Sequence, residues 1–95
     1  MGIIDKLWRK PKADPDARRR HLLAHGRITD GLILDTETND AGEEIAIYLY
    51  TLNGVDFESS DILTSEQKLD RAKYAPGAKV GIRYEQRNQG NSVLE

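Results

Sequence analysis

Residues 43–62, EEIAIYLYTLNGVDFESSDI, predict a β-hairpin with its turn at Asn53-Gly54. Asn-Gly is the strongest short hairpin signal, because both central residues of a type I′ turn need positive φ. The stretch before the turn is rich in Ile and Tyr, as is typical of strands. A two-residue turn also sets the register, so that Leu52 should pair with Val55, Tyr50 with Phe57, and Tyr48 with Ser59.

This register divides the hairpin into two faces with different side chains. One face gathers Tyr48, Tyr50, Leu52, Val55 and Phe57, and the other carries Ile45, Ile47, Leu49 and Ile62. Both faces are apolar enough to be at least half covered. We therefore expect a core on one face and a second element, such as a helix over residues 15–25, on the other.

The helix over residues 15–25 is predicted from the residues at its two ends. Asp14 can cap it, Pro15 occupies the first helical position with its φ already fixed, and Gly26 can end it in a left-handed conformation. After the helix the apolar period changes to two, which predicts a strand from Ile28 to Asp35 and a polar loop over residues 36–42.

The chain after the hairpin predicts one short helix and two more strands. Thr64-Ser65-Glu66-Gln67 is a capping-box pattern, from which a helix should run to about Lys73. Alternation over Val80–Tyr84 predicts a fourth strand, and residues 91–94 predict a short fifth one. The expected fold is mainly β: a small five-stranded antiparallel barrel or sheet, OB-like or SH3-like, with an N-terminal helix and a short helix between strands three and four.

The N-terminal segment GIIDKLWRK, residues 2–10, combines an apolar face with a basic rim. The residues expected to contact a membrane or a partner are Ile3, Ile4, Leu7 and Trp8, with Lys6, Arg9 and Lys10. Pro11 stops this segment. The chain is therefore predicted to comprise an amphipathic basic arm, residues 1–13, and one small β domain with a leading helix, residues 14–95.

Charge is segregated along the 95 residues. Every Lys and Arg lies outside residues 28–67, and that stretch carries ten acidic residues. The segregation gives the folded protein two electrical ends, although the net formal charge is only −2. Cysteine is absent, which excludes disulfides and thiolate metal sites and agrees with a cytoplasmic protein.

Sequence patterns that would indicate a catalytic or metal-binding site are weak. His21 and His25 have the spacing of a two-histidine metal pair, but Leu22 stands where the zinc-protease pattern needs Glu. The acidic run over residues 35–44 places its glycine at the wrong position for an EF-hand loop. We therefore expect no catalytic, metal or cofactor site and no enzymatic activity.

An alternative function follows from an OB-like fold. Single-strand binders of this class stack bases on strand aromatics, here Tyr48, Tyr50 and Phe57. The acidity of residues 28–67 makes nucleic acid an unfavourable partner, because phosphate contacts dominate affinity.

From Gly26 onward the chain resembles a bacterial family of small β-rich domains of unknown function, often found beside transmembrane helices. The resemblance is carried by residues 26–34, by residues 48–56 with the Asn53-Gly54 turn, and by residues 76–84 with 91–94 closing. It implies a β-rich domain without a known active site. The expected function is a non-enzymatic interaction module, cytoplasmic and peripheral to a membrane, which contacts an anionic membrane surface or a protein partner through the arm.

Overall fold

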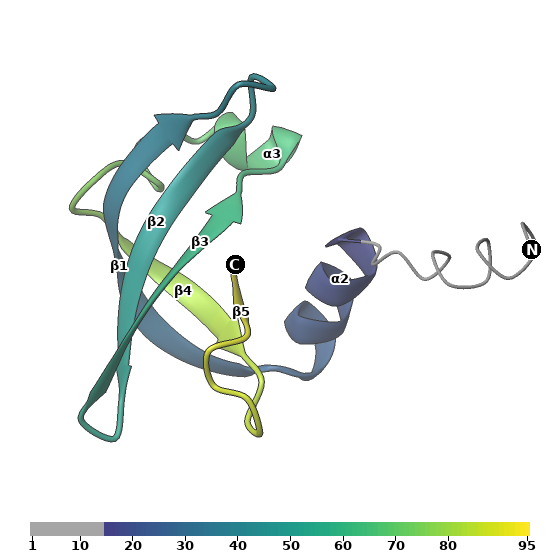
Figure 1. Ribbon diagram of the computed structural model, residues 1–95, viewed down its shortest axis with the longest axis vertical. Helices are drawn as coiled ribbons and strands as arrows, with labels where there is room; N and C mark the ends of the chain where they lie inside the picture. Colours follow the sequence, from purple (N-terminus) through teal and green to yellow (C-terminus); the bar gives the residue numbers. More distant parts are fainter. Residues whose placement is uncertain (1–14) are drawn as a thin grey trace, which may run out of the picture.

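Over residues 15–95, five antiparallel strands form a sheet that curls into a half-barrel, with a helix before it and a short helix between its third and fourth strands (Figure 1). The computed structural model describes residues 15–95, so the predicted arm and the Asp14 cap lie outside the described residues. The strand order is β3-β2-β1-β4-β5. The elements in chain order are α2 (Pro15–His25), β1 (Arg27–Thr38), β2 (Glu44–Leu52), β3 (Val55–Ile62), α3 (Ser65–Lys68), β4 (Lys79–Tyr84) and β5 (Ser92–Leu94).

The predicted hairpin is confirmed at its turn and in its register. Asn53 has φ 52° and Gly54 has φ 82°, the pair of positive values that a type I′ turn needs. Leu52 pairs with Val55, Tyr50 with Phe57 and Tyr48 with Ser59. The turn chemistry therefore decides which side chains of β2 and β3 point inward.

The core lies on the concave side of the sheet. Tyr48 and Tyr50 of β2 are almost fully buried and pack with Ile33 of β1 and Ile82 of β4. Gly31 of β1 lies opposite Tyr50, where a Cβ atom would collide with the Ile82 side chain and would lie 2.8 Å from the Leu49 carbonyl oxygen. The absence of a side chain at position 31 thus leaves room for the Ile82 side chain in the core.

Strand β1 is longer than predicted. It runs through Thr38, and its polar end pairs with β2, Thr36 lying opposite Ala46 and Thr38 opposite Glu44. The loop that follows is organised by Asn39, whose Oδ1 accepts hydrogen bonds from the backbone N–H groups of Ala41 and Glu43. The prediction of a loop from residue 36 was wrong because exposed strand ends can be wholly polar.

Helix α3 begins as predicted and ends earlier. The Thr64 side chain and Gln67 form the capping box. After Lys68 the backbone hydrogen bonds change to three-residue spacing, Leu69 N–H to Glu66 and Asp70 N–H to Gln67, and the helix does not reach Lys73. Turns then lead the chain to Tyr74, which is buried in the core.

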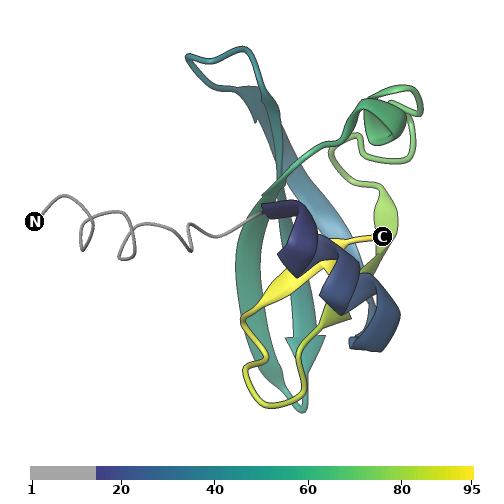
Figure 2. The ribbon, with the colours of Figure 1, turned by 90° about the vertical axis from the view of Figure 1, so that its right-hand side faces the viewer.

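Helix α2 has the predicted limits but not the predicted position. It packs mainly against β5 and β4, and Figure 2 shows it crossing in front of β5. Leu22 is its buried anchor, 1% exposed. The convex face of the hairpin, where the helix was expected, leaves Ile62 48% exposed.

Candidate interaction site

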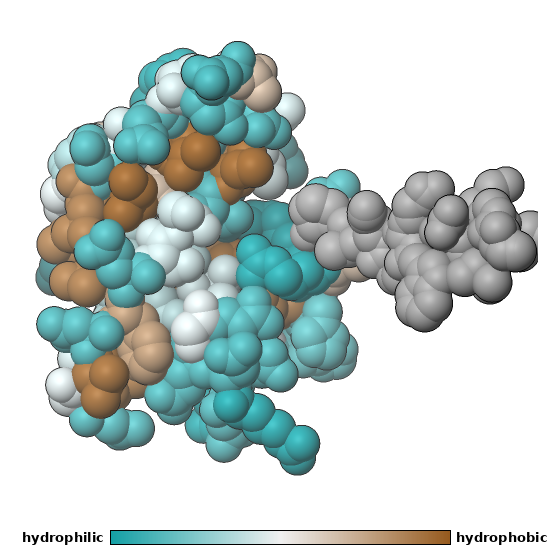
Figure 3. Space-filling view, viewed as in Figure 1, coloured by the Kyte–Doolittle hydropathy of each residue, from teal (hydrophilic) through white to brown (hydrophobic). Residues whose placement is uncertain are grey.

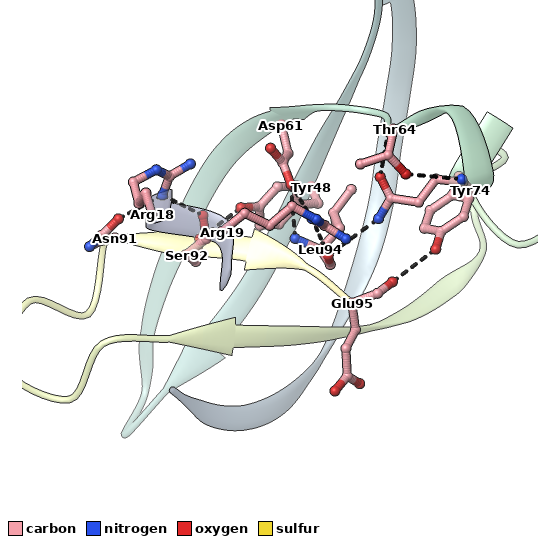
Figure 4. A network of polar contacts seen from close by, with 11 residues as sticks. Arg18, Arg19, Tyr48, Asp61, Thr64, Tyr74, Asn91, Ser92, Leu94 and Glu95 are labelled. Atoms are coloured by element: carbon pink, nitrogen blue, oxygen red, sulfur yellow. Dashed lines mark hydrogen bonds and ion pairs between the residues drawn. The ribbon is translucent and has the colours of Figure 1, made fainter. Parts of the chain in front are cut away.

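On the side that faces β3, the outer edge of β5 forms hydrogen bonds with side chains rather than with another strand (Figure 4). Asp61 Oδ2 accepts a hydrogen bond from the Leu94 N–H at 3.1 Å, and Arg19 Nη1 donates to the Leu94 carbonyl oxygen at 2.9 Å. Gln67 Nε2 lies 3.3 Å from the same carbonyl. An exposed strand edge is a template for pairing with other chains, and these side chains occupy it. We call this region the β3–β5 seam.

Further hydrogen bonds extend the β3–β5 seam toward the end of the molecule where α2 meets the loop before β5. Arg18 Nη1 donates to Asn91 Oδ1 at 2.7 Å and to the Ser92 carbonyl oxygen at 3.1 Å. Within the core, the Tyr48 hydroxyl and Ser92 Oγ share a hydrogen bond of 2.7 Å. Burial raises the pKa of Tyr48 above its ordinary value, more strongly than its hydrogen bonds lower it.

Asp61 is the acidic residue of the seam. It pairs with Ala46 and therefore points to the same side of the sheet as Tyr48. Its Oδ2 atom lies 3.5 Å from Arg19 Nη1, and its side chain is 12% exposed. Burial raises the pKa of the Asp61 carboxyl, although the Leu94 N–H and the charge of Arg19 act in the opposite direction. The sequence signal for this residue was available, because the Asn-Gly register already predicts that position 61 shares a face with the inward-pointing tyrosines.

A groove of about 710 Å³ lies beside the seam, between the start of α2 and the end of β3. Its apolar lining comes from Ile45, Ile62 and Leu63, and its acidic lining from Asp16, Glu43 and Asp61. Arg18 and Arg19 also line it, but their guanidinium groups donate to β5 and the residue before it. The groove therefore offers hydrophobic side chains bordered by carboxylates. Figure 3 shows hydrophobic side chains gathered in patches over the β1–β2–β3 side of the molecule.

The aromatic residues considered for base stacking lie in the core. Tyr48 is 0% exposed and Tyr50 is 2% exposed, whereas Phe57 is half-buried. The Tyr50 ring stacks on Phe57 with 5.4 Å between ring centroids and on Tyr48 with 6.0 Å. Tyr50 thus lies between the other two rings, and Tyr48 and Tyr50 present no ring face to a base.

The other predicted positions divide between exposed residues and residues outside the described part of the chain. The contact residues of the arm, residues 3–10, lie outside the described residues. His21 and His25 are exposed on α2, with 5.1 Å between their ring centroids. Within residues 15–95, no cluster of three or more histidine or acidic side chains could hold a metal ion.

Comparisons with known proteins add no relative. No protein-family model, curated protein or solved structure matches the chain. Among residues 15–95, no helix has the length and apolar content needed to cross a membrane.

Proposed function

We propose that the protein is a non-enzymatic interaction module whose amphipathic arm contacts an anionic membrane surface. The observation that carries the proposal is the segregation of charge, with every Lys and Arg outside residues 28–67. The arm has the ingredients of an interfacial segment, an apolar face that includes Trp8 and a basic rim of Lys6, Arg9 and Lys10. A cytoplasmic, membrane-peripheral location is part of this proposal.

The described domain supports an oriented contact. Of the ten acidic residues in 28–67, eight are exposed, and only Glu44 and Asp61 are partly buried. The arm joins the domain at α2, whose sequence includes Arg18, Arg19 and Arg20. An anionic surface would attract the arm and repel the acidic strands and loops, within a screening length of about 8 Å at physiological salt. The sheet would then face away from the membrane.

The alternative, an OB-like single-strand nucleic-acid binder, has support from topology alone. A short α-helix between the third and fourth strands, with β1 between β2 and β4, supports an OB-type connectivity over an SH3-like one. The burial of Tyr48 and Tyr50 and the exposed acidic residues weigh against stacking and phosphate contacts. We therefore favour an OB-type domain that binds through its arm.

Sedimentation with vesicles tests the proposed function. The full chain is mixed with phosphatidylcholine vesicles that contain or lack phosphatidylserine. It should sediment with the anionic vesicles and remain in solution with the neutral ones. Leu7→Asp should abolish this sedimentation, because it places a carboxylate in the apolar face of the arm.

Leu69→Asp is the matched control. It makes the same substitution with the same charge change at a residue that is 86% exposed on the described domain. The Leu69 variant should sediment like the unmodified chain. Equal sedimentation of the two variants, or no sedimentation of the unmodified chain, would contradict the proposal.

A further inference from the structure

We infer that the groove between α2 and β3 is the docking site of this chain's own residues 2–10. The inference deepens the proposed function, and its consequence for membrane binding rests on that function. Docking in the groove and contact with an anionic surface would compete for the same apolar face of the arm. The inference itself concerns binding within one molecule.

The first support is the apolar lining of the groove. Ile62 is 48% exposed and Ile45 is partly exposed, and the two lie opposite each other on the convex face of the hairpin. The arm supplies four apolar residues, Ile3, Ile4, Leu7 and Trp8. Covering exposed aliphatic side chains stabilises a complex by about 25 cal/mol for each Å² of apolar surface removed from water.

The second support is charge complementarity. Glu43 is exposed at the rim of the groove, and its Oε1 accepts one hydrogen bond, from Asn39 Nδ2 at 2.9 Å. Asp16 and Asp61 line the same groove. Arg19, 3.5 Å from Asp61, and Arg18 also line the groove and offset part of the Asp61 charge, so that Glu43 at the rim contributes most to the complementarity. The basic residues of the arm, Lys6, Arg9 and Lys10, would therefore meet carboxylates as well as apolar side chains.

The third support is the short length of chain between the groove and residues 2–10. Asp16, the second described residue, itself lines the groove. Residues 11–15 connect it to the proposed docking segment, and five residues span at most about 18 Å. A short tether of this kind gives an effective concentration in the millimolar range. A weak intrinsic affinity is thus enough to populate the docked arm.

Trp8 reports the docking directly, because it is the only tryptophan in the chain. Acrylamide quenching of its emission is measured on the full chain without vesicles. Docking predicts blue-shifted emission and quenching well below that of the same chain unfolded in urea. Ile62→Arg should bring quenching close to the unfolded value, since it replaces an apolar wall with a charge that repels the arm.

Ile28→Arg is the matched control for Ile62→Arg. Ile28 is a β-branched residue on the outward side of β1 and is 58% exposed. Its variant should retain the quenching of the unmodified chain. A second pair tests charge: Glu43→Lys should increase quenching and Glu58→Lys should not, both residues being exposed acids. Circular dichroism confirms that each variant is folded.

Three results would overturn the inference. One is quenching of the unmodified chain that equals its value in urea, and another is equal quenching of Ile62→Arg and Ile28→Arg. The third is protection that develops only as protein concentration rises, which would assign the bound arm to a second copy of the chain.

The two proposals fail separately. If docking is disproved, the vesicle results with Leu7→Asp and Leu69→Asp still test the proposed function. If both hold, Ile62→Arg should strengthen binding to anionic vesicles, by about tenfold for an arm that is about 90% docked, because apparent affinity scales with the competent fraction.

Discussion

Asp61 shows how burial and pairing compete at a single residue. Its carboxylate accepts the Leu94 N–H and lies near Arg19, yet burial raises its pKa above the ordinary value of 3.8. The native state therefore holds this proton more tightly than the unfolded chain does. The contribution of Asp61 to the free energy of unfolding is complete below the ordinary pKa and is lost as pH rises through the raised native pKa.

Asp61→Asn removes this titration and keeps an oxygen that can accept the Leu94 N–H. The free energy of unfolding of the unmodified chain, minus that of the variant, should fall as pH rises from 3.8 through the raised native pKa and stay level above it. Urea unfolding over a pH series measures the difference. A difference that rises with pH would show that the charge of Arg19 outweighs burial.

Gly31 is a residue of β1 at which the core leaves no room for a side chain. A Cβ atom there would press on the Ile82 side chain and the Leu49 carbonyl oxygen. Gly31→Ala should lower the free energy of unfolding by about 1–3 kcal/mol, the usual cost of overpacking a core. Gly90→Ala is the control, because the nearest atom to its added Cβ is Asn88 Oδ1 at 3.9 Å, and it should change stability by less than about 0.5 kcal/mol. Equal effects in urea unfolding would contradict this account of the core.

Helix α2 is held to the sheet by one apolar anchor and by arginine side chains. Leu22 is 1% exposed, and Arg18 and Arg19 donate to backbone oxygens of β5. Leu22→Ala should lower the free energy of unfolding by about 2–5 kcal/mol. Leu69→Ala removes the same atoms from an 86% exposed side chain and should cost less than about 0.5 kcal/mol. A Leu22 variant as stable as the Leu69 variant would show that α2 is not packed as described.

The sequence predicts elements well where local chemistry decides them. Asn53-Gly54 determines the hairpin register, and Thr64 with Gln67 determines where α3 begins. The position of α2 is decided by contacts with residues more than 70 positions away, such as Arg19 with Leu94, which no local pattern reveals. For the same reason the side chains that occupy the β5 edge were not predicted, although the register placed Asp61 on the inner face.

At the scale of the whole molecule, exposed acidic residues surround an apolar core. Five antiparallel strands curl around the tyrosine core, and eight of the ten acidic residues of 28–67 are exposed around it. The charge segregation was visible in the sequence. The groove beside the seam was not, because it is formed by α2, the end of β3 and the loop after it, elements whose relative positions depend on the folded sheet.

The central claim is that the arm, rather than the sheet, makes the protein's contact with an anionic surface. Trp8 emission, recorded while the full chain is titrated with vesicles, tests it most directly. Phosphatidylserine-containing vesicles that also carry brominated phosphatidylcholine, a quencher held within the bilayer, should reduce Trp8 emission, and Leu7→Asp should abolish this effect. A quencher within the bilayer distinguishes membrane contact from docking in the groove, where Trp8 would already be shielded from acrylamide. Trp8 emission that does not fall while the protein sediments with the same vesicles would contradict the claim, because the contact would then be made elsewhere.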